Sequence, residues 1–396
     1  MVAVVAAGTA TLILRPRGGL IEPTAVEAKA YFSPGELERA DDFRELQRLL
    51  GLGGIALSAA TLGVIALRPP RRVRRLLGRA SGRPLRGAAL VGAGISLTIV
   101  VVGLPLAAWR HERAVDAGLA TQSFGHWLGD VMKSAAISAV IAAIGAALAL
   151  ALIRRFPRHW WLPGSAVVAG FAVVGLYLSP VLLDPLFNDF EPLPRGQLRA
   201  DVLRLADRAG VDVGEVYRVD ASRRTSAANA YVNGLGNSKR VVLYDTLIDE
   251  FPHDEVRVVV GHELAHQKHN DLLRGLAWLA LVAPAGTFLT QVLAERFAGR
   301  RELGRPAALP AVALAITLAA LGLGAASNVL SREVEARADA FALDLTRDPA
   351  DFIKFERRIA LRNISDTDPP RLLHLLFATH PTTLERLGIG VAWRAE

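Results

Sequence analysis

Long uncharged stretches recur along the chain and predict helices that cross a membrane. Six of them hold 19 to 26 residues each, which is enough to span a hydrocarbon core of about 30 Å as an α-helix. A shorter apolar stretch of 14 residues begins the chain without a basic leader, which favours a short first transmembrane helix over a signal peptide. The seven stretches are residues 1–14, 49–67, 87–109, 134–153, 160–183, 275–294 and 306–331. The pattern therefore predicts about seven transmembrane helices.

The polar segment 184–274 has the pattern of a small folded unit. Apolar residues at helical spacing over Leu198–Ala209 predict a helix that ends at Gly210. Strand-like segments follow at Val216–Val219, Asn229–Val232 and Arg240–Tyr244. The last two flank a turn-rich piece with two glycines, which predicts a β-hairpin.

Composition favours a membrane protein over a soluble enzyme. Hydrophobic residues make up 52% of the 396 residues and charged residues only 21%, with a mean hydropathy of +0.30. The net charge of +8 comes from arginines gathered in short segments, which is typical of membrane flanks, so we expect no nucleic-acid partner. The chain has no cysteine, and any metal ligands would therefore be His, Asp or Glu.

The distribution of basic residues indicates an orientation in the membrane. Residues 68–86 carry eight arginines and no acid, and the loops 154–158 and 296–305 carry three and four more. These 15 basic residues lie on one side of the predicted spans, against nine in the opposite loops, 15–48 and 110–133. The positive-inside rule therefore favours a cytoplasmic arginine-rich side and an external main polar segment.

The motif that carries chemistry is His262-Glu263-Leu264-Ala265-His266, an H-E-x-x-H pattern after an apolar run. On a helix, residues four apart share a face, so His262 and His266 can direct two imidazoles at one ion. Glu263 then stands beside the ion, where it can take a proton from water. Zinc suits imidazole ligands and keeps one position open in catalytic sites. The alternative interpretation is a helix with two surface histidines and no metal.

Two candidates compete for the third ligand position. His269 shares a helix face with His262 but lies about 10 Å farther along the axis, too far for one ion on a straight helix. Glu335 and Asp339 are four residues apart, just after the last apolar stretch. One carboxylate could bind the metal while the other hydrogen-bonds a ligating histidine. Acidic pairs at this spacing also occur on ordinary solvated helix faces, so the spacing alone leaves both roles open.

Several further motifs follow one another between about Thr121 and Leu387. They are Ser123–Trp127, Asp184–Asn188, Ser226–Tyr231, Lys239–Leu247, His262–His266, Ser331–Asp339, and His380-Pro381 with Arg386. In these motifs and their order the chain resembles the type I CAAX prenyl proteases, integral-membrane zinc metalloproteases related to the HtpX-type proteases, and its composition suggests a bacterial member.

The resemblance implies roles for the site residues. His262, His266 and Glu335 would bind one zinc ion per chain, and Glu263 would act as general base. Asp339 would hydrogen-bond a metal ligand without binding the metal itself.

The resemblance also extends the site beyond the metal. His380 and Arg386 would line it, with His380 placed to stabilise the oxyanion. An edge strand would pair with an extended substrate peptide; its substrate-binding residues would be Asn229, Ala230 and Tyr231.

The expected fold is an all-α membrane protein with a small β element. About seven transmembrane helices would enclose an intramembrane chamber, capped by a gluzincin-like zinc metalloprotease domain with a short β-sheet or hairpin. Four parts are expected in chain order. They are transmembrane helices 1–5 (1–183), the metalloprotease domain with the H-E-x-x-H helix (184–274), transmembrane helices 6–7 (275–331), and the C-terminal part of the metalloprotease domain (332–396).

The predicted function is that of a membrane-embedded zinc endopeptidase acting on peptide or protein substrates, lipidated or membrane-embedded ones included. One alternative is a quality-control protease with broad clients; another is a non-hydrolytic chamber protein that binds lipid-linked molecules. The chain departs from the family at Gln267 and Asp271, where the prenyl proteases usually have Trp and His, which leaves the substrate open. The resemblance implies a multi-pass protein of the cell membrane with a cytosolic catalytic domain, and this conflicts with the arginine distribution.

Overall fold

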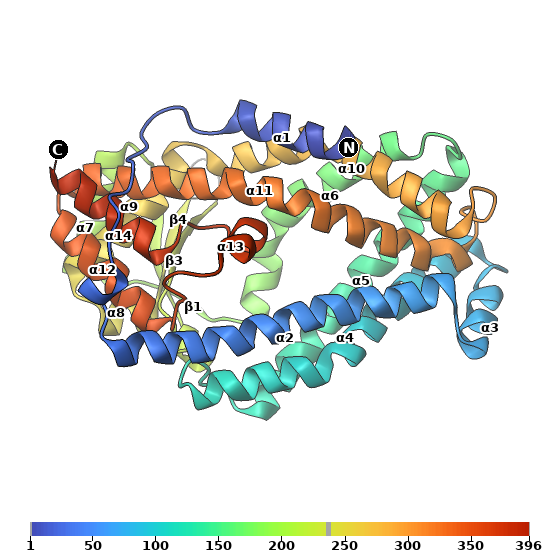
Figure 1. Cartoon of the computed structure of the whole chain (residues 1–396), viewed down its shortest axis with the longest axis horizontal. Helices are drawn as coiled ribbons and strands as arrows, with labels where there is room; N and C mark the ends of the chain where they lie inside the picture. Colours follow the sequence, from blue (N-terminus) through green and yellow to red (C-terminus); the bar gives the residue numbers. More distant parts are fainter. Residues whose placement is uncertain (1, 235–238, 396) are drawn as a thin grey trace.

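The computed structural model of the chain describes residues 2–234 and 239–395 and has an elongated shape with two unlike ends (Figure 1). Long helices run along most of its length, and a small sheet with its covering helices occupies one end. The helices are α1 (Val2–Leu14), α2 (Pro34–Leu67), α3 (Arg71–Ala80), α4 (Pro84–Asp116), α5 (Phe124–Arg155), α6 (Trp161–Leu178), α7 (Gln197–Ala209), α8 (Asp245–Glu250), α9 (His253–Lys268), α10 (Asp271–Ala298), α11 (Leu309–Thr346), α12 (Pro349–Arg362), α13 (Arg371–Phe377) and α14 (Thr383–Ala395). The strands are β1 (Phe190–Pro192), β2 (Glu215–Val219), β3 (Ala230–Asn233) and β4 (Arg240–Tyr244).

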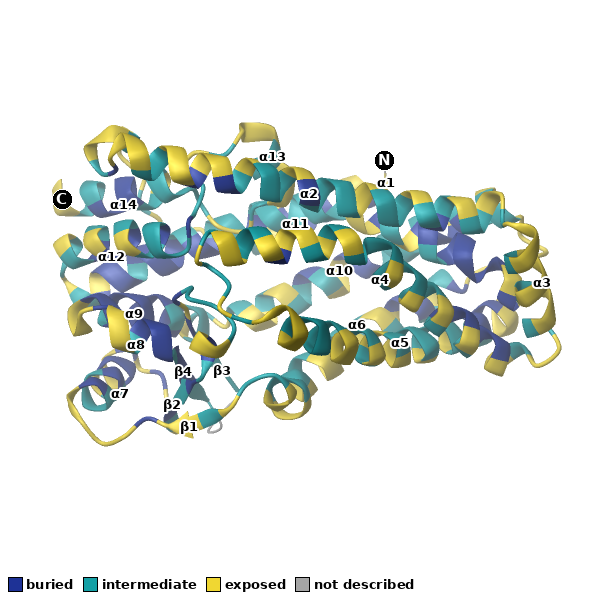
Figure 2. Cartoon of the chain, turned by 90° about the horizontal axis from the view of Figure 1, so that it is seen from below, coloured by how far each residue is buried: buried dark blue, intermediate teal, exposed yellow. Residues whose placement is uncertain are grey.

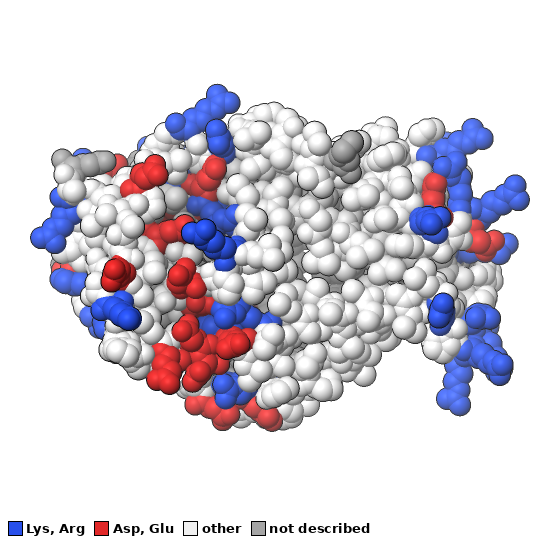
Figure 3. Space-filling model, in the orientation of Figure 1, with Lys and Arg blue, Asp and Glu red and all other residues white. Residues whose placement is uncertain are grey.

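Six helices of the described chain are long and apolar enough to cross a membrane, and α1 adds a shorter apolar helix. The six are α2, α4, α5, α6, α10 and α11, and each covers all or most of one predicted stretch. Only 11% of the most apolar window of α2, α4 or α5 is buried inside the protein, as expected for surfaces that face lipid. A broad band without charged side chains separates two charged ends (Figure 3). The predicted fold class is confirmed.

The segment between α2 and α4 corrects one expectation. The sequence analysis treats residues 68–86 as a loop, whereas Arg71–Ala80 form the helix α3. Val73, Leu77 and Ala80 recur at helical spacing and are the half-buried residues of this helix. The arginines around them hide this short apolar stripe in the sequence.

The sheet has four strands in the order β1-β2-β4-β3. β1 pairs antiparallel with β2, β2 pairs parallel with β4, and β3 pairs antiparallel with β4, so β3 forms an edge. The predicted hairpin is confirmed by β3 and β4, although the tip of its turn, residues 235–238, lies outside the described residues. The predicted helix is α7, which ends at Gly210 with φ 66°, a left-handed conformation that suits glycine.

Helix α9 is packed between the sheet and α11, and this packing positions the site (Figure 2). It begins directly after Pro252. A Cβ atom on Gly261 would lie 3.4 Å from the Cα of Ala342, so α9 and α11 approach closely at this point. α11 runs unbroken for 38 residues from the membrane region into this domain. Its last turns therefore bring their side chains against α9.

Candidate active site

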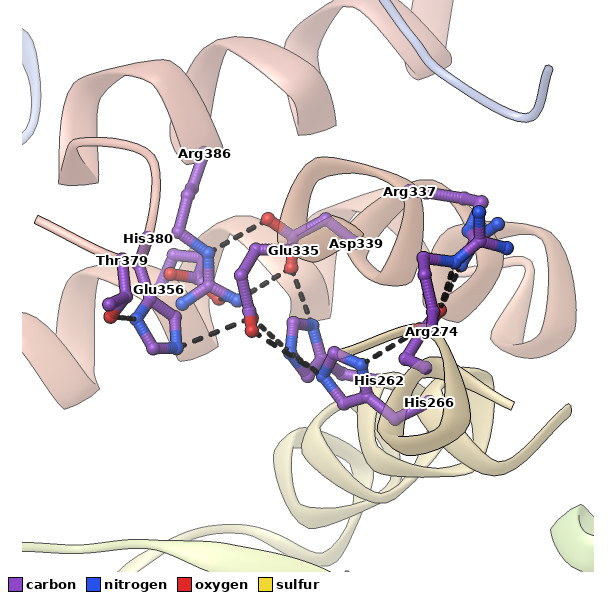
Figure 4. A network of polar contacts seen from close by, with 11 residues as sticks. His262, His266, Arg274, Glu335, Arg337, Asp339, Glu356, Thr379, His380 and Arg386 are labelled. Carbon is purple, nitrogen blue, oxygen red and sulfur yellow. Dashed lines mark hydrogen bonds and ion pairs between the residues drawn. The ribbon is translucent and has the colours of Figure 1, made fainter. Parts of the chain in front are cut away.

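Facing side chains of α9 and α11 bring two imidazoles and a carboxylate together (Figure 4). His262 and His266 lie one helical turn apart, with their Nε2 atoms separated by 3.2 Å. The carboxylate of Glu335 on α11 lies 3.0 Å from Nε2 of His262 and 3.7 Å from Nε2 of His266. The H-E-x-x-H motif and the distant Glu335 thus meet at one point, 73 residues apart in the chain for His262 and Glu335.

A second layer of carboxylates orients both imidazoles. Nδ1 of His262 lies 2.8 Å from Asp339, and Nδ1 of His266 lies 3.1 Å from Asp271. An Nδ1–H that donates to a carboxylate leaves the lone pair on Nε2. Both Nε2 atoms then face each other and Glu335, an arrangement that is repulsive unless a proton or a metal cation lies between them. This donor set of two nitrogens and one carboxylate fits a metal ion, and it matches the ligand types of catalytic zinc sites.

The electrostatics of His262 agree with this interpretation. Burial lowers the pKa of the His262 imidazole, but its hydrogen bonds with Asp339 and Glu335 outweigh burial and hold the pKa well above its usual value. The surroundings of this ring therefore stabilise positive charge at the centre of the site.

Glu263 lies beside the two histidines. Its carboxylate and the ring nitrogens of His262 and His266 all lie within 4.8 Å of one another, a group that could hold a metal ion. Burial raises the pKa of the Glu263 carboxyl, and the two histidines partly offset that rise. A carboxylate with a raised pKa next to the metal position is suited to accept and release a proton.

Arg386 connects the second layer to the C-terminal helices. Its guanidinium donates to both oxygens of Asp339, at 2.8 and 2.6 Å, and lies 2.9 Å from Glu356. Burial raises the pKa of Glu356 to about 7, with Asp339 adding to the rise and Arg386 opposing it. The sequence analysis places Arg386 in the site but misses Glu356, which no motif marks.

Asp271 is a further residue whose role the sequence analysis misses. Besides His266, it contacts Arg337 of α11 and Arg274 of α10, whose Nε lies 3.3 Å from Oδ1. Arg274 in turn donates to the carbonyl of Leu14 at the end of α1. A network thus runs from the first helix to a histidine of the site. Its signal in the sequence is an acid five residues after His266.

His380 reaches the site from the loop between α13 and α14. Its Nε2 lies 3.3 Å from Glu335, its Nδ1 lies 2.9 Å from the hydroxyl of Thr379, and its backbone carbonyl lies 3.0 Å from Nε2 of His374. The His380 side chain is 57% exposed, so it remains accessible beside the buried Glu335. His269, the competing third ligand, ends α9 and packs edge-on against Phe341 with ring centroids 5.6 Å apart.

Of the predicted substrate residues, Ala230 and Tyr231 lie on β3 at the edge of the sheet, and Asn229 directly precedes the strand. The amide of Tyr244 donates to the carbonyl of Asn229, so the strand alternation turns the backbone groups of Ala230 and Val232 toward the free edge. The side chain of Asn229 accepts from the Ala230 amide at 2.9 Å, and Gln267 of α9 donates to the Val232 carbonyl at 3.1 Å. The Ala230 carbonyl and the Val232 amide flank Tyr231 on this edge.

One cavity adjoins the site, and a second adjoins the first. The first, of about 700 Å³, is lined by His380, Thr379 and Arg386. A second, of about 870 Å³, lies among α2, α4, α5 and α11. Both are lined in part by Gly51, Ile55 and Phe377, so the space beside the site adjoins the space among the membrane helices.

A multi-pass helical chain with a His-Glu-His metal group at one end has the architecture of a membrane metallopeptidase. The comparison with known families agrees. The chain belongs to peptidase family M48, whose profile matches residues 192–388, while the profile described as CAAX prenyl protease N-terminal, five membrane helices, matches residues 52–189. This is a family of zinc endopeptidases, and the chain is a metallopeptidase.

Individual relatives support the same assignment. The uncharacterized metalloprotease YhfN of Bacillus subtilis is 29% identical over 380 residues, covering 93% of this chain and 88% of YhfN. CAAX prenyl protease 1 of Saccharomyces cerevisiae is 31% identical over 183 residues, covering 45% of this chain and 40% of the yeast protein. The crystal structure of S. mikatae Ste24p superimposes with a TM-score of 0.76 at 20% identity, covering 98% and 97% of the two chains. That likeness shows a shared fold.

Proposed function

We propose that this chain is a zinc-dependent endopeptidase in which His262, His266 and Glu335 hold the metal and Glu263 is the general base. One observation carries the proposal. Both histidines present their Nε2 atoms to Glu335 because Asp339 and Asp271 occupy their Nδ1 atoms. If the two histidines were ordinary surface residues, there would be no reason for three carboxylates to surround them.

The residues around the metal position divide the proton chemistry between them. A zinc ion held there supplies Lewis-acid chemistry, polarising the scissile carbonyl and making a nearby water more acidic. Glu263 accepts the proton of the attacking water and delivers it to the leaving amine. His380, exposed beside Glu335, donates a hydrogen bond to the oxyanion, and loss of such a donor typically slows catalysis about 100- to 1,000-fold.

The substrate, in our proposal, is an extended peptide that pairs with the free edge of β3. The Ala230 carbonyl and the Val232 amide offer one acceptor and one donor on either side of Tyr231, to which the backbone of an added strand can bond. The adjoining cavity among the membrane helices favours peptides that arrive from the bilayer, with a lipid group or an apolar segment in that cavity. Relatives named CAAX prenyl proteases support a C-terminally prenylated peptide as the first substrate to test.

Mass spectrometry of products tests this proposal. The detergent-purified chain is incubated with a set of plain peptides and their C-terminally prenylated counterparts, and Glu263→Ala is the matched inactive variant. Faster cleavage of prenylated peptides, lost in the variant, is the expected result. Broad cleavage of plain peptides would instead favour a quality-control protease, and zinc-loaded chain that cleaves neither would contradict the endopeptidase assignment.

For sidedness we propose that the site faces away from the cytoplasm. The arginine-rich loops lie at the end of the molecule opposite the site (Figure 3), which supports the positive-inside expectation over the one drawn from the family. Because the chain has no cysteine, single thiols can be introduced directly as Asp207→Cys near the site and Gly82→Cys at the other end. A membrane-impermeant maleimide should label the first in intact cells and the second only after lysis. The reverse pattern would place the site in the cytoplasm.

A further inference from the structure

The end of the molecule farthest from the site carries a dense set of exposed arginines. We call it the arginine end and define it by the arginines of residues 68–86, 154–158 and 296–305. All eight arginines of residues 68–86 are exposed, and this segment contains no acid. Within the described part of the chain, none of these eight forms an ion pair. Their charge is therefore not neutralised by the protein itself.

Helix α3 presents five of these arginines from a fixed position. It lies across the ends of α2 and α4 (Figure 1), with Leu77 and Ala80 packed against a cluster that includes Ala88 and Leu150. A Cβ atom on Gly87 would lie 1.9 Å from the carbonyl oxygen of Ala80, so α4 and the end of α3 can approach this closely only with glycine there. The apolar stripe faces the protein and the arginines face outward.

The rest of the arginine end adds charge with little compensation. Arg154 and Arg155 end α5, Arg158 follows it, and all three are exposed. Of the four arginines at 296–305, Arg300 pairs with Glu295 and Arg305 pairs with Glu302. Glu302 is the single acid within the three segments of this end. Figure 3 shows the basic side chains gathered beside the uncharged band of the membrane helices.

The chemistry that matches this surface is a phosphate attached to an apolar chain. Guanidinium groups bind phosphate oxygens through two parallel hydrogen bonds, and arginines next to a membrane span attract anionic lipids. The neighbouring surface is apolar, and Leu76, on α3 itself, is 62% exposed. A lipid satisfies both parts of this surface, with its head group on the arginines and its acyl chains along the helices.

We propose that the arginine end is a binding surface for anionic phospholipid head groups of the surrounding membrane. Attraction of this kind is worth about fivefold in affinity for each arginine near the surface. The surface anchors the end opposite the site in an anionic leaflet. It acts through the number of its charges, so no single arginine carries the binding.

Native mass spectrometry of the full chain in neutral detergent tests the proposal. The probes are dioleoyl phosphatidylglycerol and dioleoyl phosphatidylcholine, added separately at equal concentration. The unaltered chain should retain the anionic lipid at least tenfold better, and this preference should shrink as salt is raised. The test variant replaces four arginines of α3 with glutamine: Arg71, Arg72, Arg74 and Arg75. It should lose at least tenfold of the preference and keep its peptidase activity.

A matched variant removes the same charge elsewhere. It replaces four exposed arginines outside the arginine end with glutamine: Arg17, Arg195, Arg371 and Arg394. This control should keep the lipid preference, and lysine at the four α3 positions should keep most of it, because lysine preserves the charge. Equal loss in the control, equal retention of the two lipids by the unaltered chain, or full displacement by inorganic phosphate would each overturn the proposal. The lipid and salt comparisons use the unaltered chain and so hold even if the glutamine variant fails to fold.

Discussion

At the site the charged side chains are buried and meet partners of defined geometry, whereas at the arginine end they are exposed and, in the described part of the chain, only Arg300 and Arg305 form ion pairs. Asp339 is fully buried between His262 and Arg386, and Glu356 is 2% exposed beside the same arginine. The arginines of α3 all face solvent. Burying a charge is unfavourable unless a partner compensates it, so the site cannot lose one group without stranding another. The arginine end can lose one charge with little effect.

This difference ranks the expected effects of substitution. At the site, one substitution of a residue at the metal position, or of a carboxylate that hydrogen-bonds a ligating histidine, should change metal binding or catalysis by orders of magnitude. At the arginine end, only several changes together should be measurable. The expected effect of a substitution at the site therefore decreases with the distance of the residue from the metal position.

The largest effect is expected for Glu335→Ala. The change removes the carboxylate that faces both Nε2 atoms, so the purified chain should lose its zinc and its peptidase activity together. Zinc content measured by inductively coupled plasma mass spectrometry checks this. His269→Ala is the control, because that ring packs against Phe341. If His269→Ala lost zinc while Glu335→Ala kept it, the choice of third ligand would be wrong.

The next largest effect is expected for Glu263→Gln. The amide keeps the shape of the side chain but cannot accept the proton of the attacking water, so cleavage should slow by about 100- to 10,000-fold. Zinc content should stay unchanged. The two measurements are made on the same preparation. Loss of zinc from this variant would mean that Glu263 is a ligand.

A smaller effect on metal affinity is expected for Asp271→Asn. Loss of a carboxylate that orients a ligating histidine typically weakens metal binding about 10- to 100-fold, and competition with a chelator measures that change. The control is Asp254→Asn on the same helix as His266, where the side chain is 65% exposed. Equal zinc affinity in the two variants would remove Asp271 from the metal site and leave it as a partner of Arg337 and Arg274.

The sequence could predict those features whose causes are local. Apolar length marks the six long spans, and helical spacing alone places His262 and His266 on one face of α9. The hairpin of β3 and β4 follows from alternating strands around a turn. The four-part division of the chain stays a prediction.

Features that depend on the direction of the chain between elements could not be predicted in the same way. α9 ends at Lys268, and Asn270 adopts a left-handed conformation with φ 53° before α10 begins at Asp271. That turn brings Asp271 back to Nδ1 of His266, and no spacing rule gives its angle. Glu356 arrives from α12 through packing alone.

The smallest effect is expected for Gln267→Leu, which touches the substrate edge and leaves the metal alone. Its amide holds the Val232 carbonyl of β3 at 3.1 Å, and a hydrogen bond of this kind contributes about 0.5–1.5 kcal/mol. If β3 receives the substrate, a looser edge strand should raise KM by two- to tenfold with kcat and zinc content nearly unchanged. The control Gln197→Leu removes an exposed glutamine on α7 whose side chain donates to Asp201 of the same helix. A fall in kcat with KM unchanged would instead mean that Gln267 supports the catalytic helix and that the substrate binds elsewhere.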